Sequence, residues 1–396
     1  MAKGRGETAV GLQIHKEYAQ ITWYDTTVKE PCTCGAGDGE EPELIPVPEK
    51  VRVIFADSLQ EPETDLLDAL KQFLEQVLER IPGERSGDML RVMVTVPHLT
   101  VSMQTMLPEA LGQLGLERRN IYLQDYFSSF YYYTINQKKE LWNGDVALLE
   151  YHEPDMIGYV LHTDHGKNPA LVTVKEAARM TVDPRLLAGR DPEWVDREKD
   201  RLLFELLKKL FERRNVVTSY LVGDYYDGSW AVRSFQYLCQ RRHAFRGGNL
   251  YTKGACYAAM TRCGMLKKSD LLFLGTDMIS ENIGMNMRIN GKEGYYPVVS
   301  AGINWYEAHH ECEFIPDHED RITLVTKPMD GGEEVSHILY LDSFPKRPNR
   351  ATRLRMTVFF TSAQICRVEV EDLGFGGLYA PSGKRWKREI RMEGRT

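Results

Sequence analysis

The 396-residue sequence lacks three features that would each assign it to a particular class of protein. No uninterrupted apolar run approaches the length of about 18 residues that spans a bilayer, so we expect no membrane association. The polar first residues contain no apolar core of a secretory signal, which favours a cytoplasmic location. A basic block is also missing. Because 50 basic residues are mixed with 57 acidic ones, for a net charge of −7, we expect no nucleic-acid partner.

Cysteine is scarce, and its distribution argues against a disulfide framework. The seven cysteines are an odd number, and most lie in apolar stretches typical of a protein core. This pattern predicts reduced thiols in a cytosolic protein. Cys32 and Cys34 lie in a Gly- and Glu-rich stretch, where a loop with two free thiols is favoured over a metal site. His309, His310 and Cys312 lie in a predicted strand and its flanks, and we expect no metal there either.

The apolar content is sufficient for a large core, because 42% of the residues are hydrophobic and 27% are charged. Up to about residue 268, short β-branched runs alternate with longer segments whose apolar residues recur every three or four positions. This alternation predicts an α/β domain on a mixed sheet. The expected strands are 10–14, 21–25, 51–55, 91–96, 121–123, 146–150, 157–162 and 216–222. The expected helices are 64–78, 102–114, 127–133 and 196–214.

The pattern changes after about residue 271. Helical periodicity disappears, and short strands alternate with turns that are rich in Gly, Asn and Asp. The clearest strands are 322–326, 337–341, 354–360 and 366–370. We therefore predict a separate β-sandwich domain over residues 271–396.

Six segments carry a resemblance to a known superfamily. Residues 10–25 resemble the first phosphate hairpin of the actin superfamily, and most closely that of the DnaK-type heat-shock chaperones. The later segments follow in the order of that family; they are 92–116, 122–131, 145–161, 219–223 and 252–259. Each motif is weak by itself, and the specificity lies in their number and order.

The resemblance implies an architecture for the whole chain. It predicts an α/β actin-like, or ribonuclease H-like, two-lobe ATPase fold over residues 1–268, with lobe I at about 1–143 and lobe II at about 144–268. The β-sandwich at 271–396 would then correspond to the chaperone substrate-binding domain. The intervals 44–90 and 163–212 are short, which predicts reduced outer subdomains. The chain thus resembles a bacterial branch of the actin and heat-shock ATPases with degenerate nucleotide-binding motifs.

The chain departs from the family where the family handles ATP. In the first hairpin a family ATPase needs an acidic residue and small or hydroxyl residues, so that backbone N–H groups and Mg²⁺ can reach the phosphates. This sequence has Gln13 at the acid position and His15 at the glycine position. Lys16 and Glu17 replace the hydroxyl residues that follow.

The second hairpin and the adenosine motif depart as well. The second hairpin has Glu150 and then His152, Glu153, a proline and Asp155, where the family has an aspartate and a run of glycines. In the adenosine motif Gly223 is kept, but the second glycine is Asp224. The predicted vestigial cleft therefore comprises Gln13, His15, Lys16, Glu17, Glu150, His152, Asp155, Gly223 and Asp224.

These losses support three functional hypotheses of different kinds. The first is a non-catalytic DnaK-like protein, a pseudo-ATPase scaffold or polypeptide-binding module, with a polypeptide partner and no cofactor, metal or catalytic residue. The second is a divergent ATP-dependent chaperone that still binds nucleotide in the interlobe cleft. The third is a hydrolase that uses an acid/base pair among His15, Glu17, Glu150 and His152, although the sequence shows no nucleophile beside them.

Two further segments invite a functional interpretation. The aromatic run 126–133 falls at an interlobe helix of the family, so we expect most of it to pack, with one or two tyrosines exposed. The Gly-rich segment 372–386 follows a strand and opens no helix. It therefore predicts a long hairpin or a binding loop that carries Phe375 and Trp386, rather than a phosphate loop.

Overall fold

The structure is a computed structural model of the chain. The residues that it describes are 7–36, 41–55, 64–83, 89–167, 169–187, 189–223, 226, 230–289, 291–317, 320–329 and 331–392. The chain divides into two compact units, Met1–Phe273 and Leu274–Thr396. The sequence prediction places this division between residues 268 and 271.

Lobe I of the first unit is built on a mixed six-stranded sheet. Its strands are β1 (Thr8–Ile14), β2 (Tyr18–Asp25), β3 (Glu30–Thr33), β4 (Ile45–Pro46), β5 (Leu90–Val96) and β6 (Ile121–Asp125). Its helices are α1 (Glu49–Arg52), η1 (Val53–Phe55), α2 (Thr64–Leu78), α3 (Val101–Gln113), η3 (Arg118–Asn120), α4 (Tyr126–Ile135) and η4 (Lys139–Leu141). The strand order is β3-β2-β1-β5-β6, and β4 pairs with β2. β1 is antiparallel to β2 and parallel to β5.

Lobe II repeats this plan with a second six-stranded sheet. Its strands are β7 (Asp145–His152), β8 (Asp155–Asp164), β9 (Leu171–Thr181), β10 (Val216–Val222), β11 (His243–Arg246) and β12 (Leu272–Leu274). Its helices are α5 (Pro184–Leu187), α6 (Pro192–Phe211), α7 (Val232–Leu238) and α8 (Leu250–Arg262). The strand order is β11-β10-β7-β8-β9-β12, with β7 antiparallel to β8 and parallel to β10.

The two lobes therefore share one topology. Counted along the chain within each lobe, the first five strands of lobe II and the strands β1, β2, β3, β5 and β6 of lobe I both lie in the order 3-2-1-4-5. In both lobes the first and second strands form the antiparallel hairpin at the centre of the sheet. This is the ribonuclease H-like unit, and its duplication is the actin-like fold that the resemblance predicts. The mixed α/β architecture is thus confirmed.

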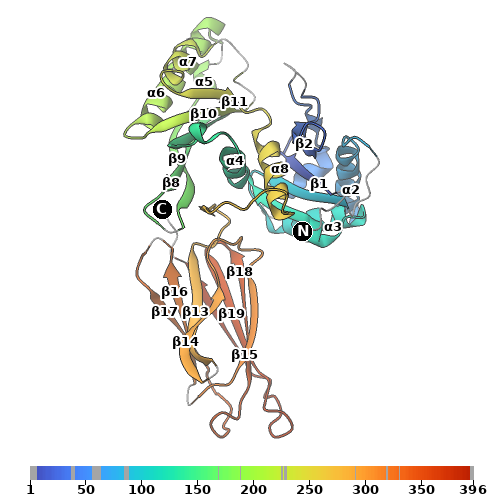
Figure 1. The fold of residues 1–396 in the computed structure, drawn as a ribbon, viewed down its shortest axis with the longest axis vertical. Helices are drawn as coiled ribbons and strands as arrows, with labels where there is room; N and C mark the ends of the chain where they lie inside the picture. The colour runs from blue at the N-terminus through green and yellow to red at the C-terminus, as the bar shows by residue number, and fades with distance from the viewer. Residues whose placement is uncertain are drawn as a thin grey trace. The chain divides into compact units, whose positions relative to one another are not determined.

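The helices α4 and α8 pack against each other, as Figure 1 shows. Two glycines allow a very close approach of backbone to backbone. A Cβ added at Gly254 of α8 would lie 2.0 Å from the carbonyl oxygen of Ser129 in α4. A Cβ added at Gly11 of β1 would lie 2.1 Å from the carbonyl oxygen of Thr252. Only glycine fits at either position, and both contacts fix α8 against lobe I.

The intervals 44–90 and 163–212, predicted to hold reduced outer subdomains, contain α2 in the first lobe and β9 and α6 in the second. In the described part of the chain, the segment between β3 and α2 adds β4, α1 and η1, and the segment between β9 and α6 adds α5. α2 and α6 occupy equivalent places in the two lobes. α6 buries the predicted stripe of Leu203, Leu206, Leu207 and Leu210, and Figure 1 shows it beside α7.

Several sequence predictions were wrong or incomplete. Residues 51–55, predicted as a strand from their β-branched content, form α1 and η1. The buried side chains there are Val51 and Ile54, three residues apart, whereas Val53 is exposed, so the period is helical. Cys32 lies not in a loop but in β3, opposite Trp23 of β2. The short or polar elements β9, α7 and β11 were not predicted at all.

The second unit is a β-sandwich of two four-stranded sheets. The first sheet contains β13 (Glu281–Ile289), β14 (Lys292–Val299), β16 (Arg321–Pro328) and β17 (Val335–Tyr340), in the order β14-β13-β16-β17. The second contains β15 (His309–Phe314), β18 (Leu354–Ser362), β19 (Ile365–Asp372) and β20 (Arg385–Arg391), in the order β15-β18-β19-β20. One core joins them, with Ile283 and Leu324 from the first sheet against Met356 and Val368 from the second.

The Gly-rich segment 372–386 connects β19 to β20, which pair antiparallel, so the predicted long hairpin is confirmed. Its anchor is Asp372, which is 4% exposed. Arg347 donates two hydrogen bonds of 2.8 Å to the Asp372 carboxylate. The backbone N–H groups of Gly374 and Ser382 donate two more. Among the helices that the structure describes, none is long and apolar enough to cross a bilayer.

Candidate functional site

The two hairpins predicted to face the cleft share a short sequence pattern. Leu12-Gln13-Ile14-His15 spans the end of β1 and the residue that follows it, and Leu149-Glu150-Tyr151-His152 forms the end of β7. Both segments lie at the carboxyl end of the central strand of their sheet, where open α/β sheets bind ligands. Comparing the two hairpins with each other, rather than each with the family, reveals this repeat. Each lobe thus offers one amide or carboxyl group and one imidazole.

Each polar side chain is bound to a tyrosine at the start of an interlobe helix. In lobe I, Nε2 of Gln13 donates to the hydroxyl of Tyr126, the first residue of α4, over 3.1 Å. In lobe II, the hydroxyl of Tyr251, in the first turn of α8, donates to Oε1 of Glu150. The same link between strand end and helix start therefore occurs in both lobes.

The equivalent residues of the two lobes then meet each other. The rings of Tyr126 and Tyr251 stack with their centroids 3.9 Å apart and their planes 16° from parallel. The rings of His15 and His152 stack with centroids 5.8 Å apart and planes 18° from parallel. We call this set the interlobe cluster; it comprises Gln13, His15, Tyr126, Glu150, His152 and Tyr251. The hairpins thus face each other, and the two stacked ring pairs join them.

The interlobe cluster is poorly suited to a polyphosphate. Gln13, Tyr126 and Tyr251 are buried. Burial raises the pKa of the Glu150 carboxyl, while the hydrogen bond from Tyr251 and the charge of His152 act in the opposite direction. Burial, together with the neighbouring Glu150 carboxyl, raises the pKa of Tyr251 well above its ordinary value. The cluster is held together by stacking and hydrogen bonds, and an ionised Glu150 would repel an anionic ligand.

A substitution at Glu150 tests this electrostatic account. Because its pKa is raised in the folded state, Glu150 ionises more easily in the unfolded chain, and this lowers stability as pH rises above the ordinary value near 4.5. Glu150→Gln keeps an oxygen acceptor for Tyr251 but does not ionise. We expect the free energy of unfolding of the variant, relative to that of the wild type, to increase as the pH rises from 4 to 8. Denaturant unfolding at several pH values measures this gain, and a constant difference between the two proteins would contradict it.

The remaining predicted cleft residues lie around the interlobe cluster. Lys16 and Glu17 are exposed at the turn between β1 and β2. Asp155, at the start of β8, is bound to the side chains of Arg179 and Thr181 in β9, so it belongs to the lobe II sheet. Gly223 has a φ of +113°, and a Cβ there would lie 2.2 Å from the carbonyl oxygen of Tyr151. Asp224 lies outside the described residues.

The geometry adds little support for the two other chemistries, a hydrolase and a metal site at Cys32 and Cys34. Glu150, the candidate acid or base of a hydrolase, is bound to Tyr251 in the interlobe cluster. The thiol of Cys34 donates to the carboxylate of Glu43 over 3.1 Å, and burial raises its pKa to about 11. Burial and the neighbouring carboxylate thus favour the protonated form of this thiol. Within the described ranges, no cluster of three or more His, Cys, Asp or Glu residues could hold a metal.

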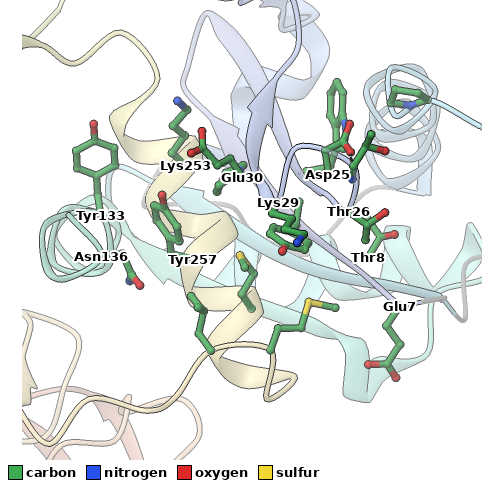
Figure 2. Close-up of a pocket in the computed structure, with 18 of the residues that line it drawn as sticks. Glu7, Thr8, Asp25, Thr26, Lys29, Glu30, Tyr133, Asn136, Lys253 and Tyr257 are labelled. Atoms are coloured by element: carbon green, nitrogen blue, oxygen red, sulfur yellow. Dashed lines mark hydrogen bonds between the residues drawn. The ribbon is translucent and has the colours of Figure 1, made fainter. Parts of the chain in front are cut away.

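A second candidate site was missed by sequence reasoning. It is a cavity of about 1130 Å³ whose floor is one face of α8. Lys253, Tyr257 and Met260 line the cavity from that face. Figure 2 shows Lys253 and Tyr257 between the end of α4 and the turn from β2 to β3. We call this cavity the α8 groove; its lining includes Glu7, Asp25, Lys29, Glu30, Met89, Tyr133, Asn136, Lys138, Lys253, Tyr257, Met260, Met265 and Leu266. The spacing of four and three residues on α8 is the signal that sequence reasoning could have used.

Two family models match the chain, one in most of the first unit and one in most of the second. The first is described as a family of unknown function (DUF5716), C-terminal, and matches residues 56–276. The second is described as a domain of unknown function (DUF8552) and matches residues 278–392. No curated protein sequence matches the chain.

Solved structures with low sequence identity also match. A ROK family transcriptional regulator, a homologue of the E. coli MLC protein, is 10% identical over 66% of this chain and 80% of its own, with a TM-score of 0.40. A Bacteroides thetaiotaomicron protein with an actin-like ATPase fold and unknown function is 9% identical over 64% of this chain and 96% of its own, with a TM-score of 0.34. The Aquifex aeolicus Ppx/GppA phosphatase is 14% identical over 55% of this chain and 67% of its own, with a TM-score of 0.31. At these scores, the assignment of the fold rests on the strand order in the two lobes.

Proposed function

The chain belongs to the DUF5716 family, and we propose that it is a non-catalytic scaffold, a pseudo-ATPase whose interlobe cleft is closed by its own side chains. The observation that carries the proposal is the stack of Tyr126 on Tyr251 between the ends of β1 and β7. In the actin and heat-shock ATPases that the chain resembles, this region approaches the nucleotide phosphates. Here it contains two aromatic rings, each hydrogen-bonded to the strand end of its own lobe.

The polar side chains beside this stack already make hydrogen bonds that a Mg²⁺ ion or a phosphate would have to replace. A Mg²⁺ ion takes carboxylate, hydroxyl and water ligands, and phosphate takes backbone N–H groups and cations. Nε2 of Gln13 donates to the hydroxyl of Tyr126, and Oε1 of Glu150 accepts from the hydroxyl of Tyr251. To admit a nucleotide, the cluster would have to separate and lose both hydrogen bonds, each worth about 1 kcal/mol or more.

A scaffold of this kind acts by binding a polypeptide. In the DnaK-type resemblance this task belongs to the β-sandwich, through an added strand at a sheet edge. Both corners of this sandwich are bridged by side chains. The hydroxyl of Tyr296 in β14 bonds Nε2 of His310 in β15 over 3.2 Å. Arg388 of β20 donates to the carbonyl oxygen of Ile338 in β17. A strand added at either sheet edge would compete with these contacts. A polypeptide partner could therefore bind at another surface of the chain.

Thermal unfolding with and without nucleotide tests the proposal. A ligand at a hundred times its dissociation constant stabilises a fold by about 2.7 kcal/mol, which shifts the melting temperature of a unit of this size by on the order of 5 °C. We expect no shift with millimolar ATP or ADP, with or without Mg²⁺, and no release of phosphate. Mg²⁺ alone is the control. A nucleotide-dependent shift with Mg²⁺ would instead favour a divergent ATP-dependent chaperone.

A further inference from the structure

We propose that the α8 groove binds an acidic, amphipathic polypeptide segment in a helical conformation. This names a site and a partner for the proposed scaffold, whereas the nucleotide experiment concerns only the interlobe cluster. The groove and the cluster use different parts of α8. Tyr251 at the start of the helix belongs to the cluster, whereas Lys253, Tyr257 and Met260 face the groove.

The size of the groove fits a short helix. Two turns of α-helix are about 11 Å long and, with side chains, about 10–12 Å across, which corresponds to a volume on the order of 1000 Å³. The cavity measures about 1130 Å³, above the range of about 300–1000 Å³ for most small-molecule pockets. Its floor is itself a helix. Tyr133 of α4 and its C-cap residue Asn136 lie on one side and the turn residues Asp25 to Glu30 on the other, as in grooves that receive a helix (Figure 2).

The apolar part of the groove is rich in methionine. Met89 precedes β5, Met260 lies in α8, and Met265 follows α8, so three separate segments supply thioether groups. Met89 is 40% exposed and Met265 is 36% exposed. Flexible, polarisable methionine side chains are common on surfaces that bind the apolar face of a helix. Tyr257 and Leu266 extend this apolar surface.

The charges of the groove select an acidic partner. Lys29, Lys138 and Lys253 line it, and none of them forms an ion pair with another described residue. Two of the three acidic residues in the lining are engaged within the protein. Glu7 pairs with Arg91. An Asp25 carboxylate oxygen accepts hydrogen bonds from the backbone of the β2–β3 turn.

Glu30 also lines the groove, and within the described part of the chain its carboxylate forms neither an ion pair nor a side-chain hydrogen bond. Hydrogen bonds from N–H groups leave the charge of Asp25 in place, so three lysines face the two carboxylates of Asp25 and Glu30. The groove thus has a local excess of one positive charge in a protein whose net charge is −7. A partner segment with Asp and Glu beside an apolar face complements this arrangement. Such complementarity determines which partner binds and how fast it associates.

A peptide selection tests the proposal directly. A random library of dodecapeptides displayed on phage is selected against the full chain, and the enriched peptides are synthesised with a fluorescent label. We expect sequences with acidic residues and with apolar residues three and four positions apart. Lys253→Glu and the exposed variant Lys138→Glu should each weaken binding of the selected peptide at least about tenfold. Lys175→Glu in β9 makes the same charge change outside the groove and should leave the affinity unchanged.

Three results would overturn the proposal. They are no enrichment over an empty support, enrichment of basic sequences, and equal affinity of the selected peptide for the wild type and both groove variants. Circular dichroism melting of each variant confirms folding, and two variants at separate segments protect against a folding defect in one. None of these results depends on nucleotide binding, so the failure of this proposal and the failure of the scaffold proposal are distinguishable.

Discussion

Gly254→Ala should destabilise the first unit by about 3 kcal/mol. The new Cβ would lie 2.0 Å from the carbonyl oxygen of Ser129 and 2.7 Å from its carbonyl carbon. Both atoms belong to the backbone of α4, so they cannot rotate away as a side chain would. The helices α4 and α8 must therefore separate, which also pulls Tyr126 from Tyr251. Chemical denaturation of the variant and the wild type measures the difference.

Gly112→Ala is the matched control. Gly112 also lies within a helix, α3, but a Cβ there has no neighbour within 4 Å. Since alanine favours a helix over glycine by about 0.5–1 kcal/mol, this variant should be slightly more stable than the wild type. The same propensity favours Gly254→Ala, so any loss there must come from the close approach of the two helices. Equal stability of Gly254→Ala and the wild type would show that α4 and α8 are not packed as described.

Arg347→Met should destabilise the β-sandwich by about 3–5 kcal/mol, because it leaves the carboxylate of Asp372 buried without its cation. The side chains of Arg347 and Asp372 are 8% and 0% exposed. Burial alone would raise the pKa of Asp372, but the hydrogen bonds from Arg347 and from the residues that follow hold it below its ordinary value. Calorimetry of the sandwich transition should show a fall in melting temperature on the order of 10 °C.

The control for this variant is Arg355→Met, which removes an arginine that pairs with Glu311, Glu313 and Glu371 on the exposed face of the same sheet. Exposed pairs contribute little, so we expect a loss below about 1 kcal/mol. The pH dependence separates the two sites further. A lowered pKa at Asp372 gives stability that is present above the ordinary value near 3.8 and is lost as pH falls below it. Arg347→Met should therefore show a weaker loss on acidification than the wild type.

Much of the fold could be predicted because its signals are local. The apolar stripe of α6 and the β-branched run of β5 depend on spacing alone, and both were found. The helical run at 126–133 packs as expected. Phe130 and Tyr131 are buried, whereas Phe127, Tyr132 and Tyr133 are partly exposed.

The missed elements owe their conformation to neighbours rather than to local sequence. β11 has only one buried or partly buried position, Ala244, and it is a strand because it pairs with β10. Residues 51–55 are β-branched but helical, because burial there follows Val51 and Ile54. No local rule gives either result, since tertiary contacts override propensity in short segments.

The candidate site shows the same limit. The sequence predicted the residues of the two hairpins, including Gln13, His15, Glu150 and His152, from their departure from a family pattern. It could not predict their partners, because Tyr126 and Tyr251 are separated from them by more than a hundred positions along the chain. The likeness to DnaK-type chaperones and the role of the β-sandwich remain predictions.

The duplicated arrangement gives the interlobe cluster a simple physical meaning. A two-lobe fold that binds no nucleotide must hold its lobes together by other contacts. Stacked aromatic pairs contribute about 0.5–1.5 kcal/mol beyond the burial of their surface. With the two hydrogen bonds to Gln13 and Glu150, the tyrosine pair can fix the lobes in one relative position. The scaffold would then present the α8 groove without any nucleotide-driven change of shape.

Isothermal titration calorimetry with Mg-ATP and Mg-ADP is the most direct test of this central claim. It measures occupation of the cleft itself and needs no assumption about hydrolysis or thermal unfolding. The account predicts no binding heat above dilution at millimolar nucleotide, because Tyr126, Tyr251 and Glu150 already occupy the space between the hairpins. Saturable binding at micromolar nucleotide would contradict it and would show that the interlobe cluster opens to admit a ligand.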